Sequence, residues 1–160
     1  VRTMGRNAAG VRGMDLEDGD EVVGMEILSK KEKLDLLSVT NSGYGKRTDE
    51  SEYRVQSRGG KGIITMKTTD KNGEVIGIRA VSNADDLMVI TDKGQVVRIR
   101  IKEISTMGRN TQGVRLVRLK EGEKVVACQS LAETDSEESG TNGGNAESGN
   151  ASSGHETQGE

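Results

Sequence analysis

The stretch Met-Gly-Arg-Asn-Thr-Gln-Gly-Val-Arg at residues 107–115 repeats the stretch Met-Gly-Arg-Asn-Ala-Ala-Gly-Val-Arg at residues 4–12. A related stretch, Gln-Ser-Arg-Gly-Gly-Lys-Gly, lies between them at residues 56–62. We call residues 4–12 frame 1, residues 56–62 frame 2 and residues 107–115 frame 3. Their arginines, at 6, 58 and 109, are separated by 52 and 51 residues. A period near 50 residues is typical of propeller blades and related arrays, so the sequence predicts a repeat protein.

The segments between the frames have the pattern of β-strands. Apolar runs at residues 34–40 and 86–91 each end in a glycine-containing turn, as in a β-hairpin. Residues 97–102 then alternate, with apolar side chains on one face and cations on the other. Further strands are expected at 21–27, at 124–128, and at 63–66 paired with 74–78. The sequence therefore predicts an all-β fold in which propeller-like blades of about four antiparallel strands form part of a ring.

Composition divides the chain into two parts. Residues 133–160 hold seven acidic residues and neither Lys nor Arg, and they are almost devoid of apolar side chains. They are predicted to be a disordered acidic tail, because such a segment cannot bury enough apolar surface to fold. Residues 1–132, about two and a half blades, then carry a net charge of about +4. A basic domain favours a polyanionic partner, and the acidic tail is a candidate competitor for the same surface.

Aromatic residues are scarce, with two Tyr and neither Phe nor Trp. Base stacking on aromatic rings is therefore disfavoured, whereas contact with a double-helix backbone needs no aromatic side chain. The chain does not begin with Met and its repeat begins inside a unit, so we expect it to be the C-terminal part of a longer protein.

The sequence offers no catalytic constellation. The single histidine, His155, lies in the predicted tail, and no metal-ligand cluster or nucleophile–base set is evident. Residues 43–48 end like a nucleotide phosphate loop, but Thr40 replaces its first glycine and no helix follows. We therefore expect no active site, metal or cofactor in this chain. The lone Cys128 and the lack of a signal peptide or membrane-spanning run indicate a cytoplasmic protein without membrane contact.

With these motifs, the chain resembles the C-terminal DNA-wrapping domain of the DNA gyrase A subunit. The residues that carry the resemblance are 108–114, 43–48 and 56–62. The resemblance implies a six-bladed β-pinwheel with duplex DNA bent around its basic rim, followed by a variable acidic tail. Residues 56–62 are similar to the family's signature heptapeptide, the gyrase-A box. Six of its residues match, and Ser57 stands where a basic residue is usual.

The resemblance also implies partners and a reaction. The partners would be double-stranded DNA, the rest of the A subunit and the gyrase B subunit, in an A2B2 complex. ATP and Mg would act elsewhere in that ATP-dependent type IIA topoisomerase, with DNA wrapping supporting negative supercoiling. Two alternatives stay open, the corresponding domain of the A-type subunit of topoisomerase IV and a propeller that binds an acidic protein.

The expected DNA contacts are cations, with the glycines and glutamine of frame 2, that would meet phosphates regardless of base sequence. Lys46 and Arg47 are expected as outward charges in a basic turn. The full set is Arg6, Lys46, Arg47, Gln56, Arg58, Gly59, Gly60, Lys61, Gly62, Arg98, Arg100 and Arg109.

Overall fold

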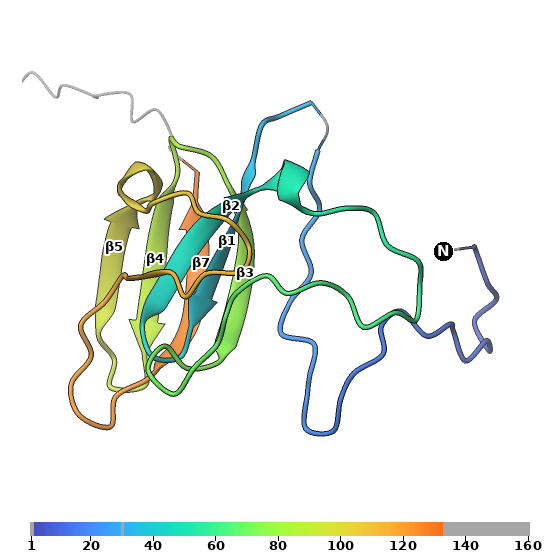
Figure 1. Ribbon diagram of the computed structural model, residues 1–160, viewed down its shortest axis with the longest axis horizontal. Helices are drawn as coiled ribbons and strands as arrows, with labels where there is room; N and C mark the ends of the chain where they lie inside the picture. The colour runs from blue at the N-terminus through green and yellow to red at the C-terminus, as the bar shows by residue number, and fades with distance from the viewer. Residues whose placement is uncertain (1, 30, 133–160) are drawn as a thin grey trace, which may run out of the picture.

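The computed structural model describes residues 2–29 and 31–132, so the predicted tail at 133–160 lies outside the described residues. Two antiparallel sheets pack against each other, and the long segments that carry frames 1 and 2 extend from one side of them (Figure 1). One sheet has the order β3-β1-β2-β6 and the other the order β5-β4-β7. The strands are β1 (Asp35–Thr40), β2 (Tyr44–Asp49), β3 (Val75–Val81), β4 (Asp86–Thr91), β5 (Val96–Arg100), β6 (Val114–Arg115) and β7 (Val125–Leu131).

Two hairpins, β1–β2 and β4–β5, repeat the same turn. In each, the threonine that ends the first strand accepts a hydrogen bond from the backbone N–H four residues later. The N–O distance is 3.2 Å at Thr40 and 3.1 Å at Thr91. The glycine between them has a positive φ, 78° at Gly43 and 79° at Gly94, which only glycine adopts freely. The predicted hairpin turns are therefore confirmed.

Each hairpin is completed by a strand from the next copy of the repeat. β3 pairs with β1, with Leu37 opposite Arg79, and β7 pairs with β4, with Val89 opposite Cys128. The core lies between the two sheets, and β3 packs closely against β7. A Cβ added to Gly77 would lie 2.6 Å from the Cys128 sulfur. Cys128 is buried, and burial raises the pKa of its thiol. The core side chains are Leu37, Val39, Val81, Leu87, Val89, Ile101, Ile104, Val117, Val125 and Cys128.

Frame 3 reaches back to the first hairpin and adds β6 to the outer edge of β2. Gly45 lies opposite Val114, and Tyr44 lies opposite Arg115. The corresponding outer edge of β5 has no paired strand among the residues that the structure describes. The β1–β2 hairpin thus gains one strand from the second copy of the repeat and one from the third.

The all-β prediction is confirmed, with antiparallel sheets of four and three strands. Two local predictions are wrong. Residues 63–66 form no strand, because β3 pairs with β1 and not with that segment. Residues 21–27 also form no strand, although they align with β3 and β7 in the repeat. Their apolar side chains stay exposed, Met25 and Ile27 each at 82%. Across the described ranges, no helix is long and apolar enough to span a membrane.

Gly45 provides a test of how closely frame 3 approaches the hairpin. A Cβ at this position would contact the Leu116 side chain and lie 2.8 Å from the Ser38 carbonyl oxygen. We expect Gly45→Ala to lower the free energy of unfolding by about 1–3 kcal/mol, because the covered strand has no room for a methyl group. Chemical denaturation measures this loss. Gly5→Ala is the matched control, since its added Cβ would have no atom within 4 Å. Equal losses in the two variants would contradict the close approach.

Candidate nucleic-acid interface

Frames 1 and 2 present their polar residues to solvent. Arg6, Gln56, Arg58 and Lys61 are all exposed, as are the three predicted glycines Gly59, Gly60 and Gly62. Two backbone hydrogen bonds, both of 3.0 Å, join frame 2 to the residues directly after frame 1: Asp15 N donates to Gly60 O and Gly59 N donates to Gly13 O. The two frames therefore lie side by side, with Arg58 and Lys61 on a shared glycine-rich surface.

The ion pairs around these frames are weak. The Lys61 ammonium lies 3.5 Å from the Glu17 carboxylate, and both side chains are about three-quarters exposed. An exposed pair of this kind contributes little to stability and is readily exchanged for another anion. Arg6 and Arg58 have no ion pair within residues 2–29 and 31–132. Phosphate oxygens can therefore reach these cations at little cost.

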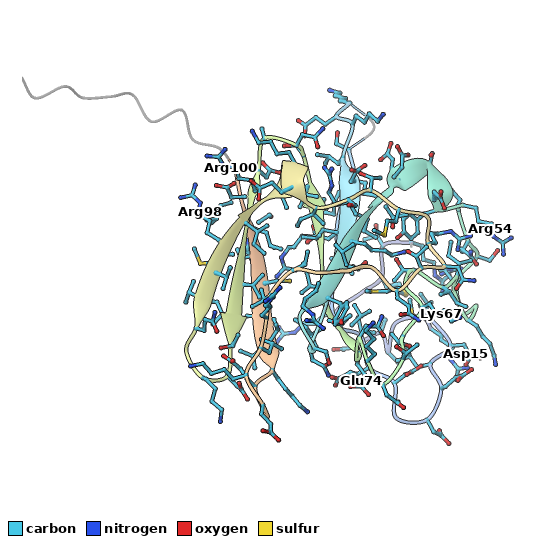
Figure 2. All side chains as sticks on the ribbon, turned by 60° about the vertical axis from the view of Figure 1, so that its left-hand side comes forward. Asp15, Arg54, Lys67, Glu74, Arg98 and Arg100 are labelled. Atoms are coloured by element: carbon cyan, nitrogen blue, oxygen red, sulfur yellow. The ribbon has the colours of Figure 1, made fainter. Side chains whose placement is uncertain are left out.

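A second group of cations lies on β5, at the opposite end of the molecule from Arg54 and Lys67 in Figure 2. Arg98 and Arg100 project from the exposed face of the strand, as the alternation predicted. Arg98 Nε donates to the Asp86 carboxylate at 2.7 Å, yet its side chain remains 70% exposed. Arg100 has no ion-pair partner in the described part of the chain and is free to meet an anion.

Lys46 does not project outward, so that prediction is wrong. It lies on β2 and is fully buried, with its Nζ donating to Gly108 O at 2.6 Å and Arg109 O at 2.5 Å. A third donation reaches Thr111 Oγ1 at 3.2 Å. Burial lowers the pKa of the ammonium, the Glu52 carboxylate raises it, and Arg109 lowers it. Lys46 therefore holds frame 3 against the hairpin and cannot reach DNA.

Arg47 is also buried, with 7% of its surface exposed. Its guanidinium donates to Ile104 O at 2.8 Å and to Asn83 Oδ1 at 2.5 Å, and it lies 3.5 Å from the Asp35 carboxylate. The repeat places Asp86 and Arg98 at the equivalent positions of the second hairpin. The alignment of residues 44–49 with 95–100 was the available signal that this segment is a strand and not a turn. Because residues 44–49 are mostly polar, their own pattern did not indicate a strand.

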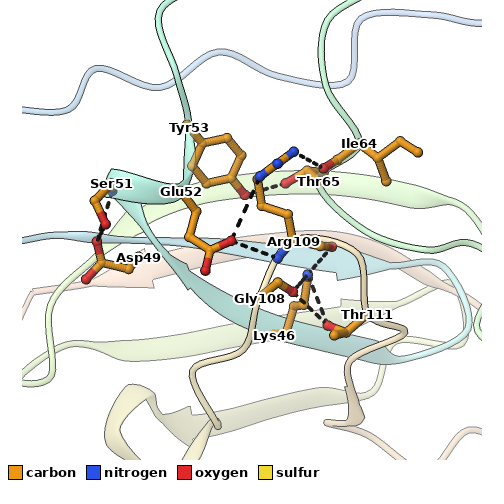
Figure 3. Close-up of polar contacts among 10 residues, drawn as sticks. All are labelled: Lys46, Asp49, Ser51, Glu52, Tyr53, Ile64, Thr65, Gly108, Arg109 and Thr111. Atoms are coloured by element: carbon orange, nitrogen blue, oxygen red, sulfur yellow. Dashed lines mark hydrogen bonds and ion pairs between the residues drawn. The ribbon is translucent and has the colours of Figure 1, made fainter.

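Arg109 is only partly exposed, and its contacts are within the protein (Figure 3). Its Nη1 donates to Ile64 O at 3.0 Å, and its Nε lies 3.9 Å from the Glu52 carboxylate. Arg115, which was not predicted as a site residue, donates to the Tyr44 hydroxyl at 3.0 Å and covers its ring. The arginine of frame 3 thus differs from Arg6 and Arg58 in being held by its own chain.

The described residues offer cations and exposed glycine backbone, which suit anion binding better than recognition of base edges. They contain no group of three or more His, Cys, Asp or Glu side chains placed to hold a metal ion. The arrangement can neutralise phosphates at several separate points on the surface.

Comparison with known proteins identifies the repeat. The model of the family described as the DNA gyrase C-terminal domain, beta-propeller, matches residues 1–29, 34–82 and 85–132, so each match contains one frame. The DNA gyrase A subunit of Salmonella typhimurium is 50% identical over 139 residues, or 86% of this chain and 16% of that protein. Its counterpart in Staphylococcus epidermidis is 44% identical over 135 residues, or 84% of this chain and 15% of that protein. The chain thus spans about one-sixth of the length of these relatives.

Solved structures share the fold. A DNA gyrase A C-terminal domain superposes with a TM-score of 0.72 at 30% identity, covering 82% of this chain and 44% of that domain. The C-terminal domain of a DNA topoisomerase IV gives a TM-score of 0.71 at 22% identity, covering 78% of this chain and 38% of that chain. At 22% identity, the similarity to the topoisomerase IV domain shows a shared fold only.

Lys46 offers a test of its internal role. We expect Lys46→Met to lower the free energy of unfolding by about 2–4 kcal/mol, because a buried ammonium and its three hydrogen bonds to frame 3 are lost. Thermal or chemical denaturation measures the change. The exposed Lys71→Met is the control and should shift stability by no more than about 0.5 kcal/mol. A Lys46→Met protein of unchanged stability that binds DNA more weakly would instead assign Lys46 to the DNA contact.

Proposed function

Because this chain belongs to the family of DNA gyrase C-terminal domains, we propose that it binds duplex DNA through the phosphate backbone and bends it. The observation that supports this most directly is the exposure of Arg6, Arg58, Lys61, Arg98 and Arg100 on separate parts of a repeat fold. Such contacts position DNA without reading its sequence. Lys46 and Arg47 are left out of the proposed contact surface, since both are buried.

Several contacts are required for bending. Bending a short duplex by tens of degrees costs on the order of 1–6 kcal/mol, which the additional phosphate contacts must offset. Cations that are distributed over a broad surface supply these contacts, whereas a single cluster would bind DNA without deforming it. We therefore place the exposed glycines of frame 2 and Gln56 beside Arg58 and Lys61 in one of several contact regions.

In the whole protein, the domain would act as the non-catalytic DNA-wrapping part of a gyrase A subunit. Residues 1–132 would form about two and a half blades of a β-pinwheel. ATP, Mg and the B subunit of an A2B2 complex would belong to the rest of the enzyme, in which wrapping supports negative supercoiling. Identities of 44% and 50% to gyrase A subunits favour gyrase over topoisomerase IV.

The salt dependence of DNA binding tests the backbone contact. We expect the affinity for duplex DNA to fall steeply with salt, with a log–log slope steeper than roughly −2. Replacing Arg58 and Lys61 together by Ala should make this slope shallower by roughly 2 units, about 0.9 for each lost phosphate contact. Fluorescence anisotropy on duplexes of unrelated sequence measures both quantities.

Lys31→Ala with Lys71→Ala is the matched control, because it removes two exposed charges outside the frames. An equal change of slope in both double variants would show that only net charge matters. Strong binding without bending, measured by energy transfer between the duplex ends, would favour a protein-interaction module over a wrapping domain.

The acidic tail provides a further test. If residues 133–160 compete with DNA for the basic surface, deleting them should tighten binding at low salt. The gain should shrink as salt rises, because the competition is electrostatic. Unchanged affinity after the deletion would remove the tail from the binding mechanism.

A further inference from the structure

The Glu52 carboxylate lies over the backbone of frame 3, beside the arginine that the frame repeats (Figure 3). Arg109 N–H donates to Glu52 Oε2 with an N–O distance of 3.4 Å, and Arg109 Nε lies 3.9 Å from the same oxygen. A Cβ on Gly108 would come within 3.9 Å of both carboxylate oxygens, so the carboxylate approaches the bare glycine backbone directly.

The donors around Glu52 are incompletely satisfied. Arg109 Nε is buried and has no hydrogen-bond partner among the residues that the structure describes. The single backbone hydrogen bond to Glu52 is at the long end of the usual range. Arg109 Nη1 is already engaged by Ile64 O at 3.0 Å, which fixes the direction of the guanidinium. The Glu52 carboxylate is therefore bound weakly, although the donors around it are held in place.

Lys46 lies close to this site, and two further cations lie at the same end of the molecule. The buried Lys46 ammonium donates to the carbonyl oxygens of Gly108 and Arg109. Arg54, two residues after Glu52, is exposed. Lys67 is also exposed, and its backbone N–H donates to Thr111 O in frame 3 at 2.9 Å. Arg54 and Lys67 lie at the same end of the molecule (Figure 2). Arg54 and Lys67 are thus available to an anion bound at this end of the molecule.

A phosphodiester could accept hydrogen bonds from the donors that the Glu52 carboxylate leaves incompletely satisfied. Its two non-bridging oxygens can accept from Arg109 N–H and from the unpaired Arg109 Nε together, and hydrogen bonds between ionised groups are stronger than neutral ones. Glycine at position 108 lets the DNA backbone approach as closely as the carboxylate does. The arginines of frames 1 and 2, Arg6 and Arg58, have no comparable carboxylate partner in the described ranges.

We propose that frame 3 forms a phosphodiester-binding site from the backbone N–H and guanidinium of Arg109, which Glu52 occupies when DNA is absent. This inference rests on the proposed DNA-binding function. Glu52 then competes with DNA at this one frame, and Arg109 contacts phosphate only after the carboxylate moves aside.

The test replaces Glu52 by Gln, which keeps an oxygen acceptor for Arg109 N–H and removes only the negative charge. We expect Glu52→Gln to tighten duplex binding at low salt about 2- to 5-fold, the range of an exposed ion pair. The log–log salt slope should become steeper by roughly 0.9, which corresponds to one added phosphate. Adding Arg109→Ala should cancel both changes. Thermal unfolding of each variant checks that the fold is retained.

Glu50→Gln is the matched control, because it makes the same change in the same connector but Glu50 has no ion pair in the described chain. Equal gains from Glu50→Gln and Glu52→Gln would refute the site and leave general charge repulsion as the cause. Weaker binding by Glu52→Gln would also refute it, since Glu52 would then support the DNA-bound geometry. No salt-dependent binding by the unchanged protein would instead refute the proposed function itself.

Discussion

The fold depends on antiparallel pairing between hairpins and strands that belong to later copies of the repeat. Neither β1–β2 nor β4–β5 can bury its apolar face and satisfy its edges alone, and a two-stranded hairpin is marginal in water. β3 and β7 each add a strand on one side and bring the core residues Val81 and Cys128 against the neighbouring sheet. The repeat is therefore a unit of sequence, whereas the unit of structure is a sheet assembled from two or three copies.

The buried Lys46 shows how this exchange is made specific. An ammonium taken out of water is costly unless its protons are all accepted, and here two carbonyls and a hydroxyl of frame 3 accept them. The equivalent residue of the second hairpin is Val97, on a strand whose outer edge no described segment covers. Gly45 of the first hairpin likewise has an aliphatic equivalent, Val96, in the second hairpin. The polar and glycine residues thus occur on the hairpin that receives a frame, and aliphatic ones on the hairpin that does not.

Sequence patterns predicted the two hairpin turns and several strands, but they did not predict the long-range pairing. The β4–β5 hairpin was predictable because apolar alternation and a Thr-Asp-Lys-Gly turn both lie within it. The β1–β3 and β2–β6 pairings depend on residues far apart in the chain, and no local pattern identifies them. For the same reason Lys46 and Arg47 were expected outside. Their burial depends on frame 3 and on residues 83 and 104, which come much later in the sequence.

The pairing of Gly45 with Val114 also limits how early the first hairpin can be completed during synthesis. A ribosome releases β1 and β2 well before it has made frame 3, and the intervening stretch is longer than one period of the repeat. During that interval β2 has an open edge, and Lys46 lacks the acceptors that frame 3 later supplies. Contacts between such distant residues slow folding and expose strand edges to other chains. Synthesis of this array therefore includes a vulnerable interval that ends only when the third copy of the repeat emerges.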